Sequence, residues 1–521
     1  MSITNRAAIG AFFWSVLAAA YVGALLTQPP RVYDEGLIVS GAVRILHGQV
    51  PYQDFNSGYP PAQFYTIAGV FSVFGTTLLA ERVWDTVWRL AIIGLAGCLA
   101  RATTRPQPAH PLPLICAGLV TGACGWRLYP MISAMLPCLA AVWCAVLYLS
   151  QRGVRWLFFS GIAAGAAILY RHDLAACVCG AVTVASCYQA IAEPKRRWLQ
   201  LAAVFWGGVL LVAAIPVLYF WLSVPHDALV RSFIDFPKIN FAGRHTPLPG
   251  PDSGAAWIEF YLPLAIIVAA AANFRQATAA RRPTLALLWM TSVSALALAT
   301  QRLDTGHAYP AIVFSMVLLC TCIAGWQREN RRLLRTLLLS GTIFCYGLLP
   351  LIGWTRQLTQ AWQAGQSGSV RVDEQLYSRN GRPDEIVRAG PVLLASDQRQ
   401  AVGYIQRHLA PGRPLYVGAT SHSLASVNDA LFYFLADRPQ ATRFDMFGPG
   451  VTTSAAVQSE IRWDLRQKQT EYVVLFRPPP SYEPNLSSAD SGVRILDDAI
   501  RQDYIQVAEF GRYTIWHRKN L

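Results

Sequence analysis

The feature that most constrains the fold is a series of long apolar stretches along the first two thirds of the chain. About 20 consecutive apolar residues are enough to cross a bilayer as a helix. Only 14% of the 521 residues are charged, against about 25% in soluble proteins. Hydropathy predicts about eleven spans, at residues 7–28, 84–100, 112–130, 131–150, 155–170, 174–192, 199–224, 256–274, 284–300, 308–326 and 333–353. The sequence therefore predicts a polytopic α-helical membrane protein, with residues 1–355 as its transmembrane domain.

The charged residues of the loops predict the orientation of these spans. Residues 1–370 hold 26 Lys and Arg against 13 Asp and Glu, whereas residues 371–521 hold 18 against 17. Basic clusters fall in the loops on the same side of the membrane as the amino terminus: Arg6; Arg101, Arg105; Arg152, Arg155; Lys195, Arg196, Arg197; Arg275, Arg281, Arg282; Arg328, Arg331, Arg332, Arg335. Positive loops mark the cytoplasmic face. We therefore expect a multi-pass protein of the bacterial cytoplasmic membrane with its amino terminus in the cytoplasm and its carboxyl-terminal part outside.

Eleven of the thirteen acids before residue 371 fall on the opposite, outer face. They are Asp34, Glu35, Asp54, Glu81, Asp85, Asp173, Asp227, Asp235, Asp252, Glu259 and Asp304. Ionisable groups near membrane depth usually line a cavity or mark a functional site. The basic excess is confined to loops of the hydrophobic part, so we expect membrane lipids as partners and no nucleic acid.

Small apolar residues complete the predicted spans. All eleven cysteines lie in spans, and their spacing matches neither a zinc site nor a disulfide framework. Gly161 and Gly165, four residues apart, predict close helix packing.

Two regions outside the spans have secondary structure of their own. Residues of about 29–80 predict two outer juxtamembrane helices on the protein surface, at 36–47 and 61–75. From residue 371 onward strand-like runs alternate with helical patterns, and the chain becomes more polar. This pattern predicts a soluble, extracytoplasmic α/β domain at residues 371–521.

The pair Asp34-Glu35 opens the first outer loop and is followed by Asp54 and Tyr59. A carboxylate in a partly dehydrated cleft can accept a proton from a hydroxyl while that oxygen attacks an electrophilic carbon. The plainer alternative is that Asp34 only caps the helix at 36–47. We favour the base, because capping does not explain the second acid, the neighbouring aromatic residues and the other outer acids.

Several basic residues are predicted on the same outer face. Arg82 opens the second span, Arg171 precedes His172 and Asp173, and Arg244 lies in the long loop 225–255. A further group, Arg302, Asp304 and His307, joins two later spans. Guanidinium forks match phosphate oxygens, although internal pairing such as Arg302 with Asp304 is an equal alternative for any single residue. We expect His172 and His307 to be hydrogen-bonded histidines rather than metal ligands.

These residues resemble the pattern of the GT-C glycosyltransferases, in particular the protein O-mannosyltransferase and aminoarabinose transferase superfamily. The resemblance rests on the outer Asp34-Glu35, on Pro-Tyr-x-Asp-Phe at 51–55 and on Tyr-Pro-Pro at 59–61. It extends to Arg82, to Arg302-x-Asp304-x-x-His307 and to the ending Tyr-Thr-Ile-Trp-His-Arg at 513–518. The pattern covers the architecture of nearly the whole chain and is specific for the superfamily, not for the substrate.

The resemblance implies an inverting transfer of a sugar from a polyprenyl-phosphate-linked donor to a hydroxyl of a glycan, lipid or protein acceptor. By position, Asp34 would be the general base, with Glu35 orienting it, the acceptor or a metal. Arg302, His307, Arg82 and Arg244 would bind the donor phosphate. Asp54, Tyr59, Arg171 and Asp304 would line the substrate site. Some relatives use a divalent metal, and no ligand set in this sequence decides the point.

Two other functions compete with transfer. A transporter or flippase for lipid-linked glycans should carry ionisable residues along a path through the membrane and often has internal repeats. The acids here gather at one face, and no repeat is evident, so transfer is favoured. The second alternative is a glycan-assembly subunit without catalysis.

Overall fold

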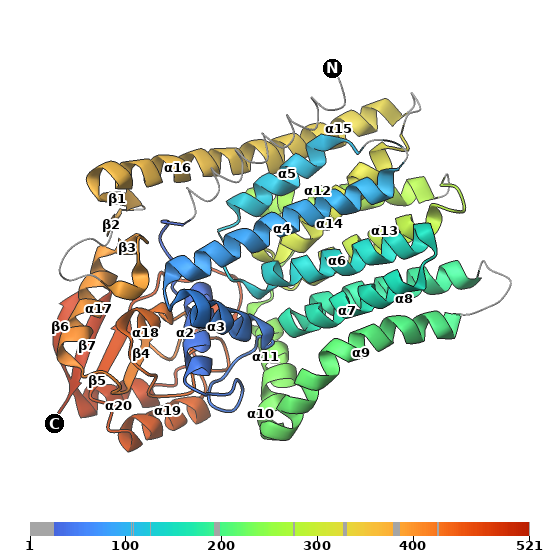
Figure 1. The fold of residues 1–521 in the computed structure, drawn as a ribbon. Helices are drawn as coiled ribbons and strands as arrows, with labels where there is room; N and C mark the ends of the chain where they lie inside the picture. Colours follow the sequence, from blue (N-terminus) through green and yellow to red (C-terminus); the bar gives the residue numbers. More distant parts are fainter. Residues whose placement is uncertain are drawn as a thin grey trace.

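The computed structural model describes residues 26–519 apart from 106, 108, 126, 192–197, 275–276, 327–330, 373, 379–385 and 425–426. A bundle of long helices is capped at one end by a domain that contains β-strands (Figure 1). The polytopic helical architecture and the carboxyl-terminal β-containing domain confirm the fold class predicted from the sequence.

Long apolar helices form the bundle. Seven helices of the described residues are long and apolar enough to cross a membrane, at 78–104, 130–151, 198–223, 257–274, 282–299, 305–323 and 332–367. The bundle helices are α4 (Leu78–Thr104), α5 (Pro111–Ala123), α6 (Pro130–Gln151), α7 (Val154–Tyr170), α8 (His172–Ile191), α9 (Trp198–Ser223), α12 (Ala255–Phe274), α13 (Arg282–Ala299), α14 (Thr305–Ile323), α15 (Arg332–Thr342), η4 (Ile343–Leu348) and α16 (Leu349–Ser367).

Some predicted boundaries differ from the observed ones, and the number of spans stays a prediction. Most of the predicted span 7–28 lies outside the described residues. The helix predicted at 112–130 ends at Ala123, ahead of the polar stretch that contains Arg127. The span predicted at 333–353 continues to Ser367, because the polar residues that follow are strong helix formers and extend the rod beyond the apolar part.

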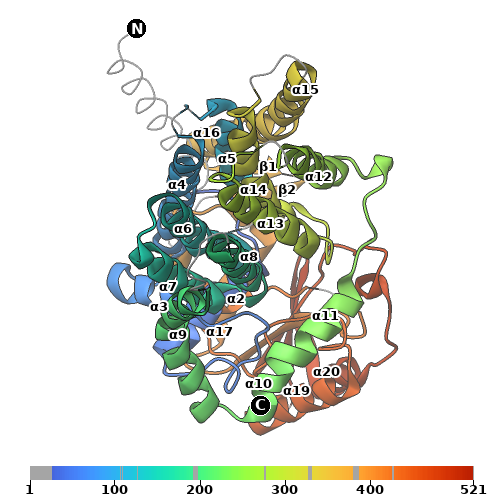
Figure 2. The ribbon, with the colours of Figure 1, turned by 90° about the vertical axis from the view of Figure 1, so that its right-hand side faces the viewer.

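Helix α14 lies at the centre of the bundle. In Figure 2 it is surrounded by α5, α6, α12 and α13, and nearly all of its residues are buried. Its residues between Gly306 and Ile323 include no Asp, Glu, Lys or Arg, and His307 lies at its polar end. Further along the helix, the Tyr309 hydroxyl lies 2.9 Å from the Thr121 hydroxyl. A helix that is apolar on all sides is expected in such a central position.

Glycines allow α7 and α9 to pack closely. A Cβ added at Gly161 would lie 2.0 Å from the carbonyl oxygen of Phe205, and one at Gly165 would lie 2.6 Å from that of Val209. The packing predicted from the four-residue spacing of these glycines is therefore present, because a side chain at either position would separate the two backbones.

The two predicted juxtamembrane helices are present as α2 (Asp34–Leu46) and α3 (Ala62–Phe74). Helix α2 is not the surface helix that the sequence suggested. Its residues from Glu35 to Ala42 are buried, and a Cβ at Gly36 would lie 2.3 Å from the backbone nitrogen of Leu431. Since Leu431 begins α18 (Leu431–Ala436), α2 is enclosed by the carboxyl-terminal domain.

The loop after α9 adds a second element to this end of the bundle. It consists of α10 (His226–Val230), η1 (Arg231–Asp235), α11 (Phe236–Arg244) and the short η2 (Pro251–Ser253). Figure 2 shows α11 between the bundle and the carboxyl-terminal domain.

The described residues of the carboxyl-terminal domain form two sheets and four α-helices. The first sheet has the order β1-β2-β3 and the second the order β4-β5-β7-β6. The strands are β1 (Ser369–Val372), β2 (Gln375–Ser378), β3 (Leu394–Ala395), β4 (Leu415–Ala419), β5 (Tyr472–Phe476), β6 (Tyr504–Phe510) and β7 (Tyr513–Arg518). The longer helices are α17 (Ser396–His408), α19 (Ala455–Gln467) and α20 (Ile495–Asp503). The second sheet and its helices match the predicted alternation, whereas the first sheet was not predicted.

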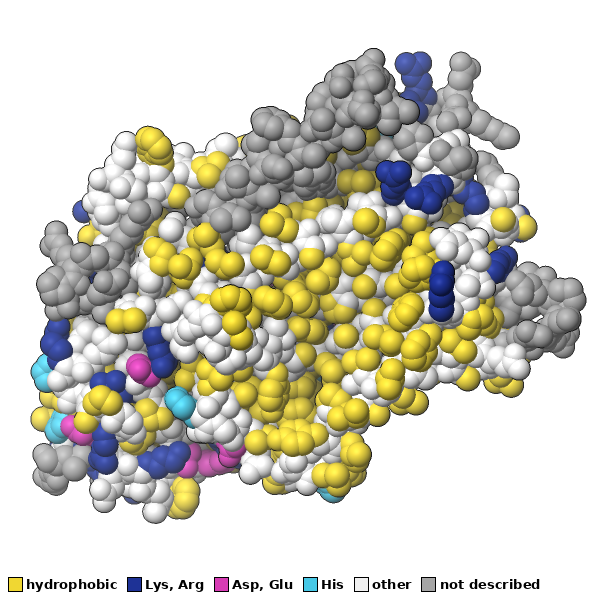
Figure 3. Space-filling view, in the orientation of Figure 1, with side chains coloured by type: hydrophobic (Ala, Val, Ile, Leu, Met, Phe, Trp, Pro, Cys, Tyr) yellow, Lys and Arg dark blue, Asp and Glu magenta, His cyan; other side chains and the backbone are white. Residues whose placement is uncertain are grey.

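The surface divides into an apolar band and two polar ends. On the face shown in Figure 3, hydrophobic side chains cover the helices, and acidic side chains appear only over the end that carries the β-strands. The opposite end shows Lys and Arg. Arg105, Arg281 and Arg331, from three predicted cytoplasmic loops, line one small cavity of about 340 Å³ at that end. The basic loops and the acids thus lie at opposite ends of the bundle, as the loop charges predicted.

Candidate active site

A cavity of about 720 Å³ lies between the end of the bundle and the carboxyl-terminal domain. Its wall is polar and comes from segments far apart in the sequence. Residues from the first 310 positions that line it include Arg31, Tyr33, Asp34, Tyr59, Tyr129, Arg171, His172, Asp173, Asn240, Arg244, Arg302 and His307. The carboxyl-terminal domain contributes Gln375, Tyr377, Gln398, Met446, Phe476 and Arg512, among others. A pocket of this size can enclose a small organic ligand.

Asp34 lies in the first turn of α2 and faces this cavity. The cap position of the helix is Tyr33, and no side chain caps α2, so helix capping does not account for Asp34. The Tyr59 hydroxyl donates a hydrogen bond of 3.4 Å to Asp34 Oδ1. Burial raises the pKa of the Asp34 carboxyl above its ordinary value, although the charges of nearby guanidinium groups, Arg31 first among them, oppose this rise. The result is a carboxylate that is more basic than one in water and is open to a ligand.

Glu35 and Arg82 lie behind Asp34 and do not line the cavity. Their side chains are 0% and 1% exposed and form an ion pair, with Arg82 Nε donating to Glu35 Oε1 at 2.9 Å. Glu35 also accepts a hydrogen bond from the backbone N–H of Arg31. The resemblance implied that Glu35 orients Asp34, the acceptor or a metal, and that Arg82 binds the donor phosphate. In this geometry the pair instead attaches α2 to α4, because each side chain is occupied by the other.

Three of the predicted arginines line the cavity, and they differ in how they are paired. Arg171 donates to both carboxylate oxygens of Asp173, at 2.8 and 3.1 Å. Arg302 lies between the carboxylates of Asp304 and Glu483. Arg244, at the end of α11, has no hydrogen bond or ion pair to any described residue at its Nε atom, although this atom is buried. A guanidinium with an unsatisfied buried donor favours an anionic ligand.

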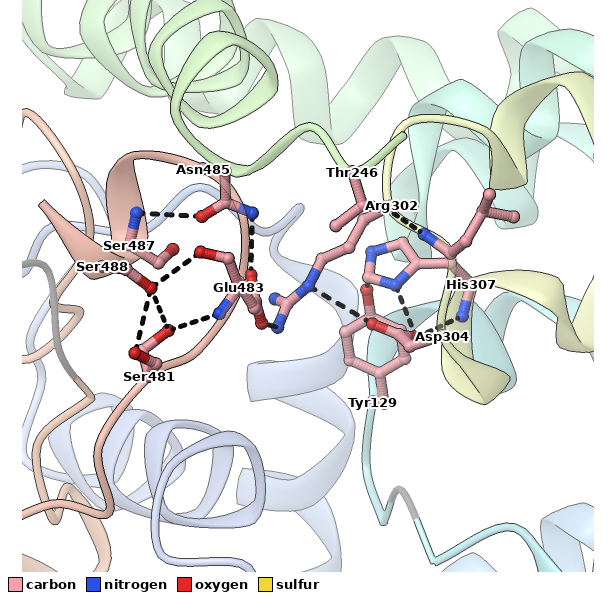
Figure 4. A network of polar contacts seen from close by, with 11 residues as sticks. Tyr129, Thr246, Arg302, Asp304, His307, Ser481, Glu483, Asn485, Ser487 and Ser488 are labelled. Atoms are coloured by element: carbon pink, nitrogen blue, oxygen red, sulfur yellow. Dashed lines mark hydrogen bonds and ion pairs between the residues drawn. The ribbon is translucent and has the colours of Figure 1, made fainter. Parts of the chain in front are cut away.

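A chain of polar contacts connects Arg302 to the bundle (Figure 4). Asp304 caps α14 by accepting a hydrogen bond from the backbone N–H of His307 at 3.0 Å. The His307 ring lies 2.8 Å from Asp304 through Nδ1 and 2.7 Å from the Tyr129 hydroxyl through Nε2. Arg302 Nε lies 3.4 Å from Asp304 Oδ2. His307 is therefore a hydrogen-bonded histidine, as expected, and both of its ring nitrogens are occupied.

The other side of Arg302 contacts a loop of the carboxyl-terminal domain. Arg302 Nη2 donates to Glu483 Oε1 at 2.5 Å. Glu483 is in turn held by Asn485, whose side-chain amide donates to Glu483 Oε2 at 3.0 Å. Figure 4 shows how the Ser481–Ser488 loop approaches the bundle at this point. This contact was not predictable from the sequence, because 181 positions separate the two residues.

Asp54 does not belong to the cavity. Its carboxylate accepts a hydrogen bond of 2.6 Å from the backbone N–H of Val50, and its carbonyl oxygen accepts one of 2.5 Å from Arg44. These contacts close the loop between α2 and α3. Asp54 is therefore not among the residues that line the cavity, whereas Tyr59 and Arg171 line it and Asp304 contacts the lining residues Arg302 and His307.

The part of the chain that the structure describes contains no cluster of metal-binding side chains. No three His, Cys, Asp or Glu side chains there are grouped so that they could hold one ion. His172 lines the cavity with an unpartnered Nδ1, but a single imidazole does not define a metal site. We assign no step to a metal.

Comparison with known proteins supports a fold assignment. Residues 59–221 match the family model described as dolichyl-phosphate-mannose-protein mannosyltransferase. Among curated proteins, none matches the chain significantly. The match is confined to α3–α9 and the residues beside them, so it covers less than half of the chain.

Two solved structures match the whole chain. Both are of ArnT from Cupriavidus metallidurans. One, bound to undecaprenyl phosphate, has a TM-score of 0.59 and 13% sequence identity over 100% of this chain and 99% of that chain. The other, in the apo state, has a TM-score of 0.58 and 15% identity over 98% of each chain. These matches agree with the fold implied by the sequence motifs. The chain therefore shares the fold of the ArnT structures over nearly its whole length.

Proposed function

We propose that the protein transfers a sugar from a polyprenyl-phosphate-linked donor to an acceptor hydroxyl, with inversion at the sugar carbon. The observation that carries this proposal is that the Asp34 carboxylate lines the same cavity as the Arg244 guanidinium, whose buried Nε has no hydrogen-bond partner among the described residues. A base and an anion-binding group are the two parts that this reaction needs. The undecaprenyl phosphate bound to the structurally similar ArnT supports a lipid phosphate as the anion.

The reaction follows from these positions. The acceptor oxygen attacks the anomeric carbon of the donor from the side opposite to the phosphate, and Asp34 takes the proton of that hydroxyl. As the new glycosidic bond forms, the bond between the anomeric carbon and the phosphate oxygen breaks, and its electron pair leaves with the polyprenyl phosphate. Arg244 stabilises the negative charge on the leaving phosphate, and Arg302, which is already paired with Asp304 and Glu483, orients it by hydrogen bonding. A single displacement of this kind inverts the configuration of the sugar carbon.

We place this reaction at the outer face of the cytoplasmic membrane. The basis is the loop charge, since the cavity lies at the acidic end of the bundle and the basic loops lie at the other. A donor carried by a lipid reaches such a site through the membrane without a soluble nucleotide.

Substitution of Asp34 by Asn is the direct test of the base. Asp34→Asn keeps the size of the side chain and removes the proton acceptor, so we expect sugar transfer to fall about 10²- to 10⁴-fold. Binding of undecaprenyl phosphate and the thermal stability of the protein should remain close to wild type. Transfer at the normal rate by purified Asp34→Asn would show that Asp34 is not the base.

Arg244 tests the anion site. A charge-assisted hydrogen bond contributes about 1.5–3 kcal/mol, so Arg244→Gln should weaken undecaprenyl phosphate binding by at least about tenfold. Lys238→Gln, on the exposed side of the same helix, is the matched control and should leave binding unchanged. Equal losses in the two variants would indicate a general charge effect rather than a site at Arg244.

Transport without catalysis has less support from the structure. The larger cavity and the one lined by Arg105, Arg281 and Arg331 share no lining residue. Between the two ends lies α14, whose apolar residues are buried. A transported headgroup would need ionisable residues along this path, and the buried pair Arg89–Asp85 within α4 is occupied by its own contact of 2.8 Å.

A further inference from the structure

The wall of the large cavity differs in charge between its two halves. The bundle half carries four arginines, Arg31, Arg171, Arg244 and Arg302. In the described part of the carboxyl-terminal domain, Arg512 is the one ionised residue that lines the cavity. The remaining polar groups of this half are the amides of Gln375 and Gln398 and the hydroxyl of Tyr377.

Arg512 is neutralised by its own domain. Its Nε donates to Asp397 Oδ2 at 2.7 Å and its Nη2 donates to Asp397 Oδ1 at 3.0 Å. This bidentate pair leaves little positive potential for a phosphate or carboxylate. An anion at this wall would also meet the Asp397 carboxylate behind the guanidinium. The ligand of this half is therefore expected to be uncharged.

The polar groups of this wall suit a ligand that both donates and accepts hydrogen bonds. The Gln375 amide lies 3.0 Å from the Tyr377 hydroxyl, and when its oxygen faces Arg512 it accepts from that guanidinium at 3.2 Å. An amide and a phenol offer donors and acceptors side by side. The Tyr377 ring adds a flat apolar surface next to them. Sugar rings present this combination, with hydroxyl groups at the edge and C–H groups on the face.

The wall is held rigidly from behind. The Gln398 side chain, which is buried, donates to Asp429 Oδ2 at 2.7 Å, and the Tyr513 hydroxyl donates to the same oxygen at 2.7 Å. The Arg512 guanidinium also lies over the Phe476 ring, 5.4 Å from its centroid. Side chains whose rotamers are fixed in this way form a preorganised binding surface.

The strands at this wall do not offer an edge to a peptide. Strand β2, which carries Gln375 and Tyr377, lies between β1 and β3. Strand β5, which ends at Phe476, lies between β4 and β7. An extended peptide binds to a sheet by adding a strand at a free edge, and the edges left here, at Gln375–Leu376 of β2 and at the two-residue β3, are too short for that. Recognition must therefore use the side chains.

We propose that the carboxyl-terminal half of the cavity is a subsite for an uncharged sugar ring of the acceptor, so that the acceptor is a glycan. This inference rests on the proposed function. The donor sugar is bonded directly to its phosphate and so belongs beside Arg244 and Arg302, in the bundle half. The acceptor sugar then occupies the opposite wall, with the attacking hydroxyl directed to Asp34.

Saturation-transfer NMR on the full-length protein in nanodiscs tests the subsite. The probes are neutral methyl hexopyranosides and pentopyranosides, the corresponding hexose 6-phosphates and a serine-containing peptide. We expect saturation transfer to a neutral glycoside, weakened about 3- to 10-fold by Gln375→Ala or Tyr377→Ala. Gln400→Ala, on the exposed surface of α17, is the matched control and should bind as wild type does, and thermal melting checks that each variant is folded.

Competition separates the acceptor sugar from the donor sugar. Bound glycoside should remain when undecaprenyl phosphate, or a sugar-loaded and non-hydrolysable analogue of it, is added. Displacement by the loaded analogue alone would overturn the assignment to the acceptor. No transfer to any neutral glycoside, stronger binding of the phosphosugars or the peptide, or no effect of the two variants would overturn the subsite. The undecaprenyl phosphate measurements on Arg244→Gln report separately on the proposed function.

Discussion

The neighbouring acids Asp34 and Glu35 differ in what their carboxylates contact. The Glu35 carboxylate is fixed by Arg82 at 2.9 Å, whereas Asp34 has one long hydrogen bond from Tyr59 and faces the cavity. The two adjacent acids therefore have different surroundings, because the first turn of the helix directs their side chains to different sides. The sequence could indicate that the pair matters. It could not indicate which acid faces the ligand, because that depends on the packing of α2 against α4.

The raised pKa of Asp34 predicts the pH dependence of transfer. The base is active when it is ionised, so activity should be lost as the pH falls through its pKa, and this loss should occur at a higher pH than for an ordinary aspartate. Arg31 is the largest of the charges that lower this pKa. Arg31→Gln should therefore move the acid limb of the kcat/KM profile to higher pH while the plateau changes little.

A series of rates between pH 4 and pH 9 measures this shift, with Arg155→Gln at the other end of the bundle as the control. An acid limb that stays in place in Arg31→Gln would mean that another group limits the reaction at low pH.

Helix α2 is the element that joins the bundle, the cavity and the carboxyl-terminal domain. It contacts α18 through Gly36, and Arg44 forms a buried ion pair of 2.8 Å with Asp445. Sequence periodicity placed the ends of α2 within two residues but assigned the helix to the surface, since the partner that buries it lies about 400 positions further along the chain.

The strands β4, β5, β6 and β7 were predictable from their local patterns. The short strands β1 to β3 were not, because β3 has only two residues.

The attachment of α2 to α4 predicts a large loss of stability when it is broken. Arg82→Met leaves Glu35 buried without its partner, and removing one member of a buried ion pair costs about 3–5 kcal/mol. The melting temperature in detergent should fall clearly for Arg82→Met and recover in part when Glu35→Leu is added. If the double variant melts no higher than the single one, the coupling between α2 and α4 does not run through this pair.

The whole molecule is polarised along the bundle axis. The acids, the large cavity and the β-strands are at one end, and the basic loops gather at the other. This arrangement was predictable from loop charge alone, because the positive-inside rule depends on sequence position rather than on packing. The contents of the cavity were less predictable. Arg302 and His307 came from a motif, whereas Gln375, Tyr377 and Glu483 belong to segments that reach the site only through the tertiary fold.

The proposed orientation predicts which end of the molecule is accessible from outside the cell. Tyr482, in the carboxyl-terminal domain, is 87% exposed, and Gln151 is exposed at the opposite end, where α6 ends. In intact spheroplasts, a membrane-impermeant maleimide should label Tyr482→Cys, whereas Gln151→Cys should react only after the membrane is permeabilised. The unsubstituted chain is the control, since its cysteines lie in the bundle and those at ten of the eleven positions are at least partly buried. Labelling of Gln151→Cys but not of Tyr482→Cys would invert the topology and move the proposed transfer to the cytoplasmic face.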